Sequence, residues 1–271
     1  KNENLKTNLA GVIPVSGYED KLGTVLPDSC FSLNKDYTAI ERSVIECAYA
    51  GCNTIWIVCN DTFAPIIKKI IGDYIIDPAS YESQNFVKYQ KQQIKYIPVF
   101  YTPVHPKDRD KRDSLGWSAL YGALVSYSIS HKISGWIAPK KYFISFPFGI
   151  YNPLLAKENR KSINSLTENF YFSFEDQTVR EGRYLGFTLF PEEWKIIKTS
   201  LKNSCSGGSR NLPLAERWSS KDFTLDKIYN NDIIVVDKKS EVEIYHDLET
   251  WESIKNYFAT PLLQKQHKIV C

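Results

Sequence analysis

Apolar runs of strand length recur along the first half of the chain, separated by stretches with helical spacing. Residues 9–15 form a short apolar run that ends at a Ser-Gly turn. Residues 54–59 are apolar almost throughout, which is typical of a strand buried on both faces of a parallel sheet. Residues 94–101 and 142–146 also have the apolar pattern of strands. Strands that alternate with helices predict an α/β fold with a mostly parallel sheet.

Helix start and stop signals lie between these strands. Thr38 is followed three residues later by Glu41, which is the spacing of a capping box. Gly51 follows this predicted helix at the position where a left-handed C-cap is expected. Pro65 fits the first turn of a second helix, and Ser114 is a good N-cap for a third, longer one.

The alternation of predicted strands and helices ends after residue 153. Residues 154–180 are polar and poorly periodic, so they predict no regular element. The pattern then predicts strands at 184–190, 232–237 and 242–246, a helix that begins at Pro191, and a last helix over 250–258.

Composition excludes several classes of protein. With 43% hydrophobic and 24% charged residues among 271, the chain is typical of a globular protein rather than a disordered one. A membrane span needs about 20 apolar residues, far more than any run here, and the polar start predicts no secretory leader. The net charge of +3 is too small to indicate binding of duplex nucleic acid. Six cysteines without metal-ligand spacing predict buried free thiols in a cytoplasmic protein.

The loop after the first predicted strand is the first candidate site. Ligands of open α/β sheets bind beyond the carboxyl ends of the strands, and Ser16, Gly17, Gly23 and Thr24 lie there in the chain. Glycines let backbone N–H groups approach a phosphate or the edge of a base. The loop is neither a GxGxxG fingerprint nor a P-loop, so a nucleotide cradle and a structural turn both remain open.

A dense mixed-charge segment is the second candidate. Residues 107–113 hold four cations and three carboxylates between a predicted strand and a predicted helix. Arg109 or Arg112 could bind a phosphate with two parallel hydrogen bonds. Asp108 and Asp110 form a D-x-D pair, a carboxylate arrangement that suits a divalent cation. The alternative is a solvated surface loop.

Several segments resemble the motifs of the sugar-phosphate nucleotidyltransferases, in the same order. That family opens with a strand, a GGxGTRLxP loop, a PKPLLPV segment, a helix, and a strand after AGxxxI. The similar segments here are LGTVLP at 22–27, DSCFSL at 28–33, AGCNTI at 50–55, LGWSA at 115–119, YLGFTLFPEEW at 184–194 and HDLETWE at 246–252. Some stretches are also similar to phage-encoded proteins of this type.

The resemblance covers about residues 9–260 and implies a fold and an activity. The implied fold is the GT-A-like one of nucleotide-diphospho-sugar transferases, a three-layer αβα sandwich with a mostly parallel central sheet. One domain would span 1–260, with a nucleotide-binding half at 9–152, an acceptor half at 153–260 that ends in a strand-helix extension, and a tail at 261–271. The implied reaction transfers a nucleoside monophosphate from a nucleoside triphosphate to a sugar 1-phosphate and releases pyrophosphate.

The resemblance also assigns site residues. An aspartate at the position of Asp247 binds Mg²⁺ in the family, which makes Asp247 the strongest catalytic and metal candidate. The alternative for Asp247 is a polar residue placed before a helix N-cap. Arg109 and Arg112 are the further catalytic candidates, and Asp108 and Asp110 the further metal candidates. The expected nucleotide contacts are Pro14, Ser16, Gly17, Gly23, Thr24, Gly116 and Trp117.

Three groups that the family uses are missing. The family's first metal ligand is the aspartate of a GD pair after a central strand, and the corresponding residues 146–151 contain no carboxylate. Val25 stands in place of an arginine, and Asp28 or Ser29 in place of a lysine. These losses remove much of the electrostatic stabilisation that phosphoryl transfer needs.

Two other functions therefore stay open. One is a glycosyltransferase on the same fold, with the D-x-D pair holding the metal of a nucleotide-sugar. The other is a protein that keeps the fold for binding or assembly without catalysis. The aromatic content of 14% also makes a homodimer plausible.

Overall fold

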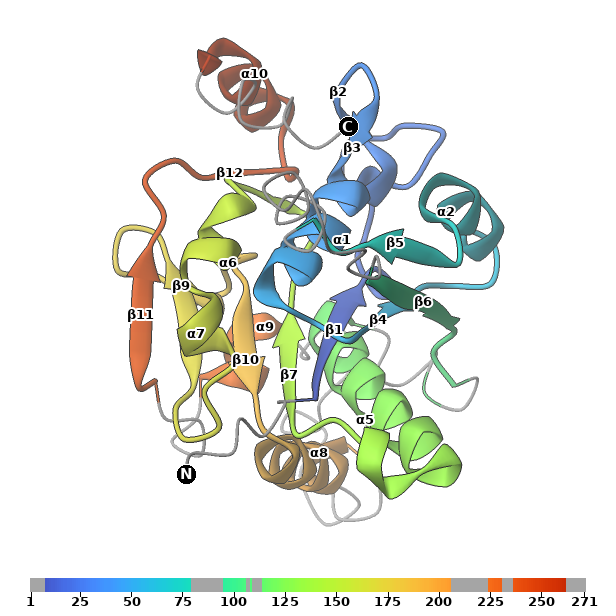
Figure 1. The fold of residues 1–271 in the computed structure, drawn as a ribbon. Coiled ribbons are helices and arrows are strands. Elements are labelled where there is room, and N and C mark those ends of the chain that lie inside the picture. The colour runs from blue at the N-terminus through green and yellow to red at the C-terminus, as the bar shows by residue number, and fades with distance from the viewer. Residues whose placement is uncertain are drawn as a thin grey trace, which may run out of the picture.

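The computed structural model describes residues 8–78, 95–105, 108, 114–205, 224–230 and 236–261. Among these residues, eight strands form one sheet in the order β11-β9-β10-β7-β1-β4-β6-β5 (Figure 1). The neighbours β7-β1-β4-β6 run parallel, whereas β10 and β5 run antiparallel to the strands beside them. The strands are β1 Leu9–Pro14, β4 Thr54–Val58, β5 Tyr74–Ile76, β6 Tyr96–Thr102, β7 Lys141–Ile144, β9 Phe170–Ser173, β10 Phe187–Leu189 and β11 Lys238–Glu241.

Helices cover both faces of this sheet. Gly11 and Val12 are neighbours on β1, so they face opposite sides of the sheet. A Cβ at Gly11 would meet the side chain of Cys47 on α1, whereas a Cβ at Gly122 of α5 would meet the side chain of Val12. The helices are α1 Ala39–Ala50, α2 Ala64–Ile71, α5 Leu115–Ile133, α6 Leu154–Glu158, α7 Arg160–Ile163, α8 Pro191–Cys205, α9 Leu225–Tyr229 and α10 Trp251–Ala259. With α6 and α7 beside α1, and α8 and α9 beside α5, the expected three-layer α/β fold is confirmed.

The predicted helix signals are confirmed in detail. The Thr38 side chain accepts a hydrogen bond from the Glu41 amide, and the Glu41 carboxylate accepts one from the Thr38 amide at 2.7 Å. Gly51 ends α1 in the left-handed region with φ 95°. Ser114 caps α5, because its hydroxyl accepts a hydrogen bond from the Trp117 amide at 3.2 Å.

The second half differs from the prediction in three places. The strand β9 and the short helices α6 and α7 lie within 154–180, where no element was predicted. The strand predicted at 184–190 is confined to β10. The strand predicted at 242–246 is wrong, because β11 ends before it and β12, His246–Asp247, begins at its last residue. The strand β11 lies at the sheet edge, where a polar sequence needs no apolar alternation. Residues 232–235 of the other predicted strand lie outside the described ranges.

A small second core joins the beginning of the chain to its end. Short strands β2 (Ser32–Asn34) and β3 (Tyr37–Thr38) lie beside the 3₁₀ helix η1 (Asp28–Cys30) and close to α10 (Figure 1). Leu22, Leu33, Leu248 and Ile254 are buried together there. The short pair β8 (Gly149–Ile150) and β12 continues this layer. The core therefore holds the loop after β1 against the segment that contains Asp247.

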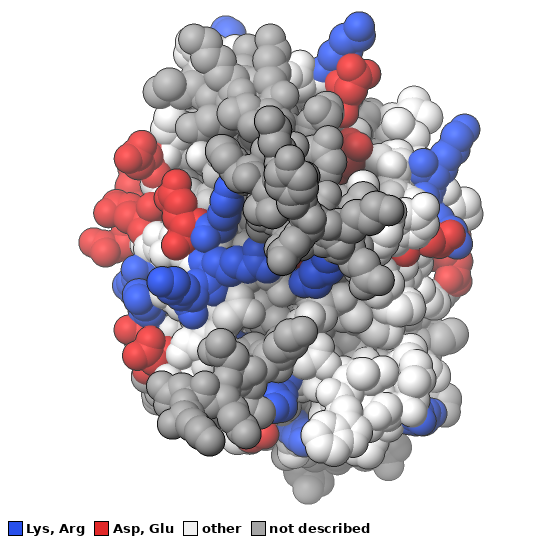
Figure 2. Space-filling view, viewed as in Figure 1, with Lys and Arg blue, Asp and Glu red and all other residues white. Residues whose placement is uncertain are grey.

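Charged side chains of both signs share the surface. Figure 2 shows a band of basic side chains over the region of α6 and α7, with acidic side chains beside it. The basic residues of these two helices are Lys157, Arg160 and Lys161. No helix within the described ranges is both long and apolar enough to cross a membrane.

Candidate functional site

A cleft of about 710 Å³ opens beyond the carboxyl end of β1. Its wall includes the loop after β1, the first turn of α5 and the segment that leads into β10. The first turn of α9 and the segment after β12 complete it. The lining residues are Gly17, Tyr18, Glu19, Lys21, Ser114, Leu115, Gly116, Gly182, Tyr184, Thr224, Leu225, Asp226 and Glu249. This is the edge of the sheet where ligands of open α/β folds bind.

The glycine loop is held directly against the start of α5. Gly17 has φ 78°, and a Cβ there would lie 2.4 Å from the carbonyl carbon of Ser114. The Ser118 hydroxyl donates a hydrogen bond of 2.7 Å to the carbonyl oxygen of Ser16. Three predicted nucleotide contacts, Ser16, Gly17 and Gly116, are thereby brought together.

The other predicted nucleotide contacts lie elsewhere. Pro14 is buried within β1 and pairs with Val58. Trp117, in the first turn of α5, is buried and does not line the cleft. Gly23 and Thr24 are exposed on the loop beyond Leu22, and no atom lies within 4 Å of the place that a Cβ of Gly23 would take.

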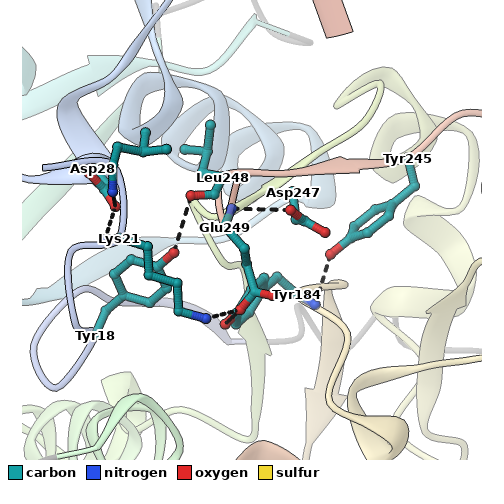
Figure 3. Close-up of polar contacts among 9 residues, drawn as sticks. Tyr18, Lys21, Asp28, Tyr184, Tyr245, Asp247, Leu248 and Glu249 are labelled. Atoms are coloured by element: carbon teal, nitrogen blue, oxygen red, sulfur yellow. Dashed lines mark hydrogen bonds and ion pairs between the residues drawn. The ribbon is translucent and has the colours of Figure 1, made fainter. Parts of the chain in front are cut away.

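Lys21 is the cation on the cleft wall that sequence analysis did not single out. Its ammonium forms an ion pair with the carboxylate of Glu249, which also accepts a hydrogen bond of 2.8 Å from the Tyr184 hydroxyl (Figure 3). Burial alone would raise the pKa of Glu249, but the hydrogen bonds from Lys21 and Tyr184 outweigh it and hold that pKa below its ordinary value. Both members of the pair are half-exposed, so the ammonium is accessible to a ligand.

Asp28 fixes the backbone around this lysine. Its carboxylate accepts hydrogen bonds from the amides of Lys21 at 2.7 Å and Leu22 at 3.2 Å, and its own amide donates to Asp20 at 2.8 Å. Burial raises the pKa of Asp28, although the two backbone hydrogen bonds oppose that effect. Asp28, one of the two residues expected where the family has a lysine, therefore shapes the loop. Val25, where the family has an arginine, is fully exposed.

Asp247 lies beside the cleft rather than on its wall. Its amide donates a hydrogen bond of 3.1 Å to the Ser253 hydroxyl, and its carboxylate accepts one of 3.1 Å from the Glu249 amide. Glu249 is among the lining residues and Asp247 is not. Asp247 thus orders the turn that presents Glu249 to Lys21 (Figure 3).

The residues around Asp247 do not fit a metal ion held by two carboxylates. In the register of β12 and β8, Asp247 pairs with Gly149, and the neighbouring Phe148 is a buried aromatic residue. No group of three or more His, Cys, Asp or Glu side chains within the described ranges is arranged to hold a metal ion. The nearby Glu249 carboxylate is already bonded to an ammonium and a phenol.

The mixed-charge segment lies mostly outside the described residues. Arg109, Asp110 and Arg112 are all in the undescribed part of the chain. Asp108 is described, and its amide donates a hydrogen bond of 2.8 Å to the carbonyl of His105. The predicted roles of these four residues stay predictions.

Solved structures with this fold match the chain over nearly its whole length. A UDP-glucose pyrophosphorylase complexed with UDP-glucose is 12% identical, with a TM-score of 0.56 over 97% of this chain and 99% of that one. The inositol-1-phosphate CTP transferase from T. maritima is 13% identical, with a TM-score of 0.56 over 98% of each chain. Rv0371c from Mycobacterium tuberculosis, in complex with manganese, is 11% identical, with a TM-score of 0.51 over 94% of this chain and 99% of that one.

These likenesses show the fold. The chain has the nucleotide-diphospho-sugar transferase fold, and the resemblance to the sugar-phosphate nucleotidyltransferases is confirmed at that level. No protein-family model and no curated protein sequence matches the chain.

Proposed function

We propose that the cleft binds a nucleoside triphosphate or a nucleotide-sugar, and that the chain transfers a nucleoside monophosphate to a sugar 1-phosphate. The observation that carries the proposal is the meeting of Gly17, Gly116 and Lys21 on one cleft at the carboxyl end of β1. The shared fold with a UDP-glucose pyrophosphorylase and an inositol-1-phosphate CTP transferase supports it. In this reaction, an oxygen of the sugar phosphate attacks the α-phosphorus, the bond to the β-phosphate breaks, and pyrophosphate leaves.

The start of α5 and Lys21 are suited to the phosphates. Ser114, Leu115 and Gly116 line the cleft, so the positive end of a 19-residue helix faces it. The Lys21 ammonium adds a full positive charge to the same cleft. Arg109 and Arg112, which come shortly before Ser114 in the chain, remain the proposed further phosphate ligands.

The carboxylates of the cleft are suited to a sugar. Glu249 and Asp226 carry carboxylates that accept hydrogen bonds from hydroxyl groups, and Tyr184 supplies both a ring and a phenol. Gly182 leaves room beside them, with φ 89° and no neighbour within 4 Å of a Cβ. A sugar phosphate placed here would point its phosphate toward Lys21 and its hydroxyls toward the carboxylates.

The predicted binding of Mg²⁺ by Asp247 has little support among the described residues. When bound, a divalent cation would neutralise charge on the transferred phosphates. Asp247 was the predicted ligand, but it is off the cleft wall, and the segment paired with it offers Phe148 and Gly149 rather than a second carboxylate. No step of the proposed reaction is therefore assigned to a metal.

A thermal-shift screen with nucleoside triphosphates, nucleotide-sugars and sugar 1-phosphates tests the binding. A ligand at 100 times its Kd stabilises a protein by about 2.7 kcal/mol, which is a measurable rise in Tm. We expect a rise with at least one nucleotide, lost in Lys21→Gln and kept in Lys35→Gln, which removes an exposed lysine outside the cleft. Absence of any rise with all of these ligands would refute the proposal.

A second candidate function is nucleotide binding without transfer. The observation that favours it is Phe148, a buried ring in the segment where the family has its first metal ligand. A pyrophosphate-release assay with a panel of sugar 1-phosphates separates the two functions, since a binding protein would give a Tm rise and no pyrophosphate. Release of a nucleoside diphosphate from a nucleotide-sugar would instead support the glycosyltransferase alternative.

A further inference from the structure

Tyr18 and Phe148 form a face-to-face aromatic stack at the base of the loop after β1. Their ring centroids lie 3.5 Å apart with an interplanar angle of 8°. Tyr184 packs its edge against both rings, at 6.0 Å from Tyr18 and 5.8 Å from Phe148. Phe148 is 1% exposed, so the stack is a fixed part of the structure. Tyr18 also lines the cleft, which places the stack between the cleft and the core.

The stack is bonded to the segment that contains Asp247. The Leu248 amide donates a hydrogen bond of 2.9 Å to the Phe148 carbonyl, and the Tyr18 hydroxyl donates one of 3.4 Å to the Leu248 carbonyl. Gly149, the residue after Phe148, is the register partner of Asp247. The backbone of Phe148 is thus bonded to the residue after Asp247, one position from the register partner of Asp247. An aromatic ring there supplies no ligand for a hard cation.

The ammonium of Lys21, which lies beside the stack, is already paired with a carboxylate of the same chain. Lys21 lies 5.9 Å from the centroid of the Tyr18 ring and pairs with Glu249. The ammonium is therefore paired with the residue whose amide donates a hydrogen bond to the Asp247 carboxylate. A lysine ammonium binds phosphate oxygens as a compact point charge and needs no carboxylate ligands of its own.

We propose that the Tyr18–Phe148 stack stands in place of a two-carboxylate metal site at Asp247, and that the cleft holds phosphate groups through Lys21 without a divalent cation. The identity of the ligand as a nucleotide rests on the proposed function above. The replacement itself rests on the stack, on the β8–β12 register and on the Lys21–Glu249 pair.

Titration with Mn²⁺ alone, followed by electron paramagnetic resonance of the free ion, tests whether a metal site exists at Asp247. We expect the same Mn²⁺ binding in the wild-type chain, in Asp247→Asn and in Glu252→Gln, which removes an exposed carboxylate from the next helix. Phe148→Asp should gain one site, because it adds a second carboxylate one position from the register partner of Asp247, and the double variant with Asp247→Asn should lose it. Wild-type Mn²⁺ binding that Asp247→Asn removes would overturn the inference.

The gain of a site also needs a folded variant. Circular dichroism would establish whether Phe148→Asp folds, and a folded variant without a new Mn²⁺ site would overturn the placement of the stack. If this variant does not fold, the comparison of the wild-type chain with Asp247→Asn decides the question by itself.

Calorimetric titration with inorganic pyrophosphate tests whether Lys21 holds phosphate groups without a divalent cation. We expect the same Kd in excess EDTA and in Mg²⁺, and a loss of about tenfold or more in Lys21→Gln, as for other hydrogen bonds to charged groups. Binding that requires Mg²⁺, or that Lys21→Gln leaves unchanged, would overturn the inference. If pyrophosphate binds in this way and no nucleotide does, the proposed function fails and this inference stands. If nucleotides bind only with Mg²⁺, the proposed nucleotide binding stands and this inference fails.

Discussion

Arg42 and Glu46, one turn apart on α1, form an ion pair of 3.2 Å with neither side chain exposed to solvent. Glu46 also accepts hydrogen bonds from the hydroxyls of Ser145 and Tyr151, and Arg42 donates one of 2.7 Å to the carbonyl of Phe146. This network ties α1 to both ends of the segment 145–151. Because that segment contains Phe148, buried charge fixes the ring that stacks under the cleft loop.

Removal of one charge from this pair should strongly destabilise the fold. Glu46→Gln leaves the Arg42 guanidinium buried without a counterion, so we expect the free energy of unfolding to fall by about 3–5 kcal/mol. Urea denaturation monitored by circular dichroism measures it. The double variant Arg42→Met with Glu46→Leu removes both charges and should recover part of the loss. A single variant as stable as the wild-type chain would show that the pair does not hold the segment.

Gly17 and Gly23 offer a matched test of the contact between the cleft loop and α5. Both have positive φ, 78° and 65°, so alanine is strained at either position by about 1–2 kcal/mol. A Cβ at Gly17 would also clash with the backbone of Ser114, whereas one at Gly23 would meet no atom within 4 Å. We expect Gly17→Ala to lower the free energy of unfolding by more than Gly23→Ala does. Equal losses would show that the loop does not press on Ser114.

Neutralisation of Glu249 should strengthen anion binding. Glu249 competes with any phosphate for the Lys21 ammonium, and two unit charges 4 Å apart in water interact by about 1 kcal/mol. We therefore expect Glu249→Gln to lower the Kd for inorganic pyrophosphate about fivefold at low salt, and Glu252→Gln to leave it unchanged. The effect should shrink as salt is added. A weaker binding in Glu249→Gln would mean that this carboxylate orients Lys21 rather than competing for it.

The same pair gives the stability a defined dependence on pH. Because the Lys21 and Tyr184 hydrogen bonds hold the pKa of Glu249 below its ordinary value of 4.5, the unfolded chain binds the proton more tightly. The contribution is therefore fully present above about pH 4.5 and is lost as the pH falls through the lower, folded-state pKa. It should be less than about 1 kcal/mol, since both side chains are more than a third exposed. Urea midpoints of the wild-type chain and Glu249→Gln should differ at pH 6, and the difference should shrink as the pH falls below about 4.5.

Local signals predicted the first half of the fold well. The capping box at Thr38, the C-cap at Gly51 and the N-cap at Ser114 depend on residues within a few positions of each other, so the sequence contains all the information they need. The strands β9 and β11 escaped prediction for the opposite reason. The polar residues of β11 become a strand because they pair with β9, about 70 residues earlier in the chain.

The site was predictable where it depends on backbone geometry. Gly17 was identified from the turn after the first strand and Gly116 from the family resemblance, and both line the cleft. Lys21 was missed because its partner Glu249 is 228 residues away, and no spacing rule connects them. The sequence showed that a carboxylate is absent from 146–151, but the stacking of Phe148 on Tyr18 depends on the fold.

Hydrogen–deuterium exchange followed by mass spectrometry tests the central claim most directly, because it shows where a nucleotide binds. The chain would be measured alone, and then with a mixture of the four nucleoside triphosphates and UDP-glucose. Slower exchange is predicted in the loop 16–22, in the first turn of α5 at 114–118 and in the segment 246–250, with a smaller effect in Lys21→Gln. Exchange that is unchanged in these three segments would contradict the assignment of the cleft as a nucleotide site.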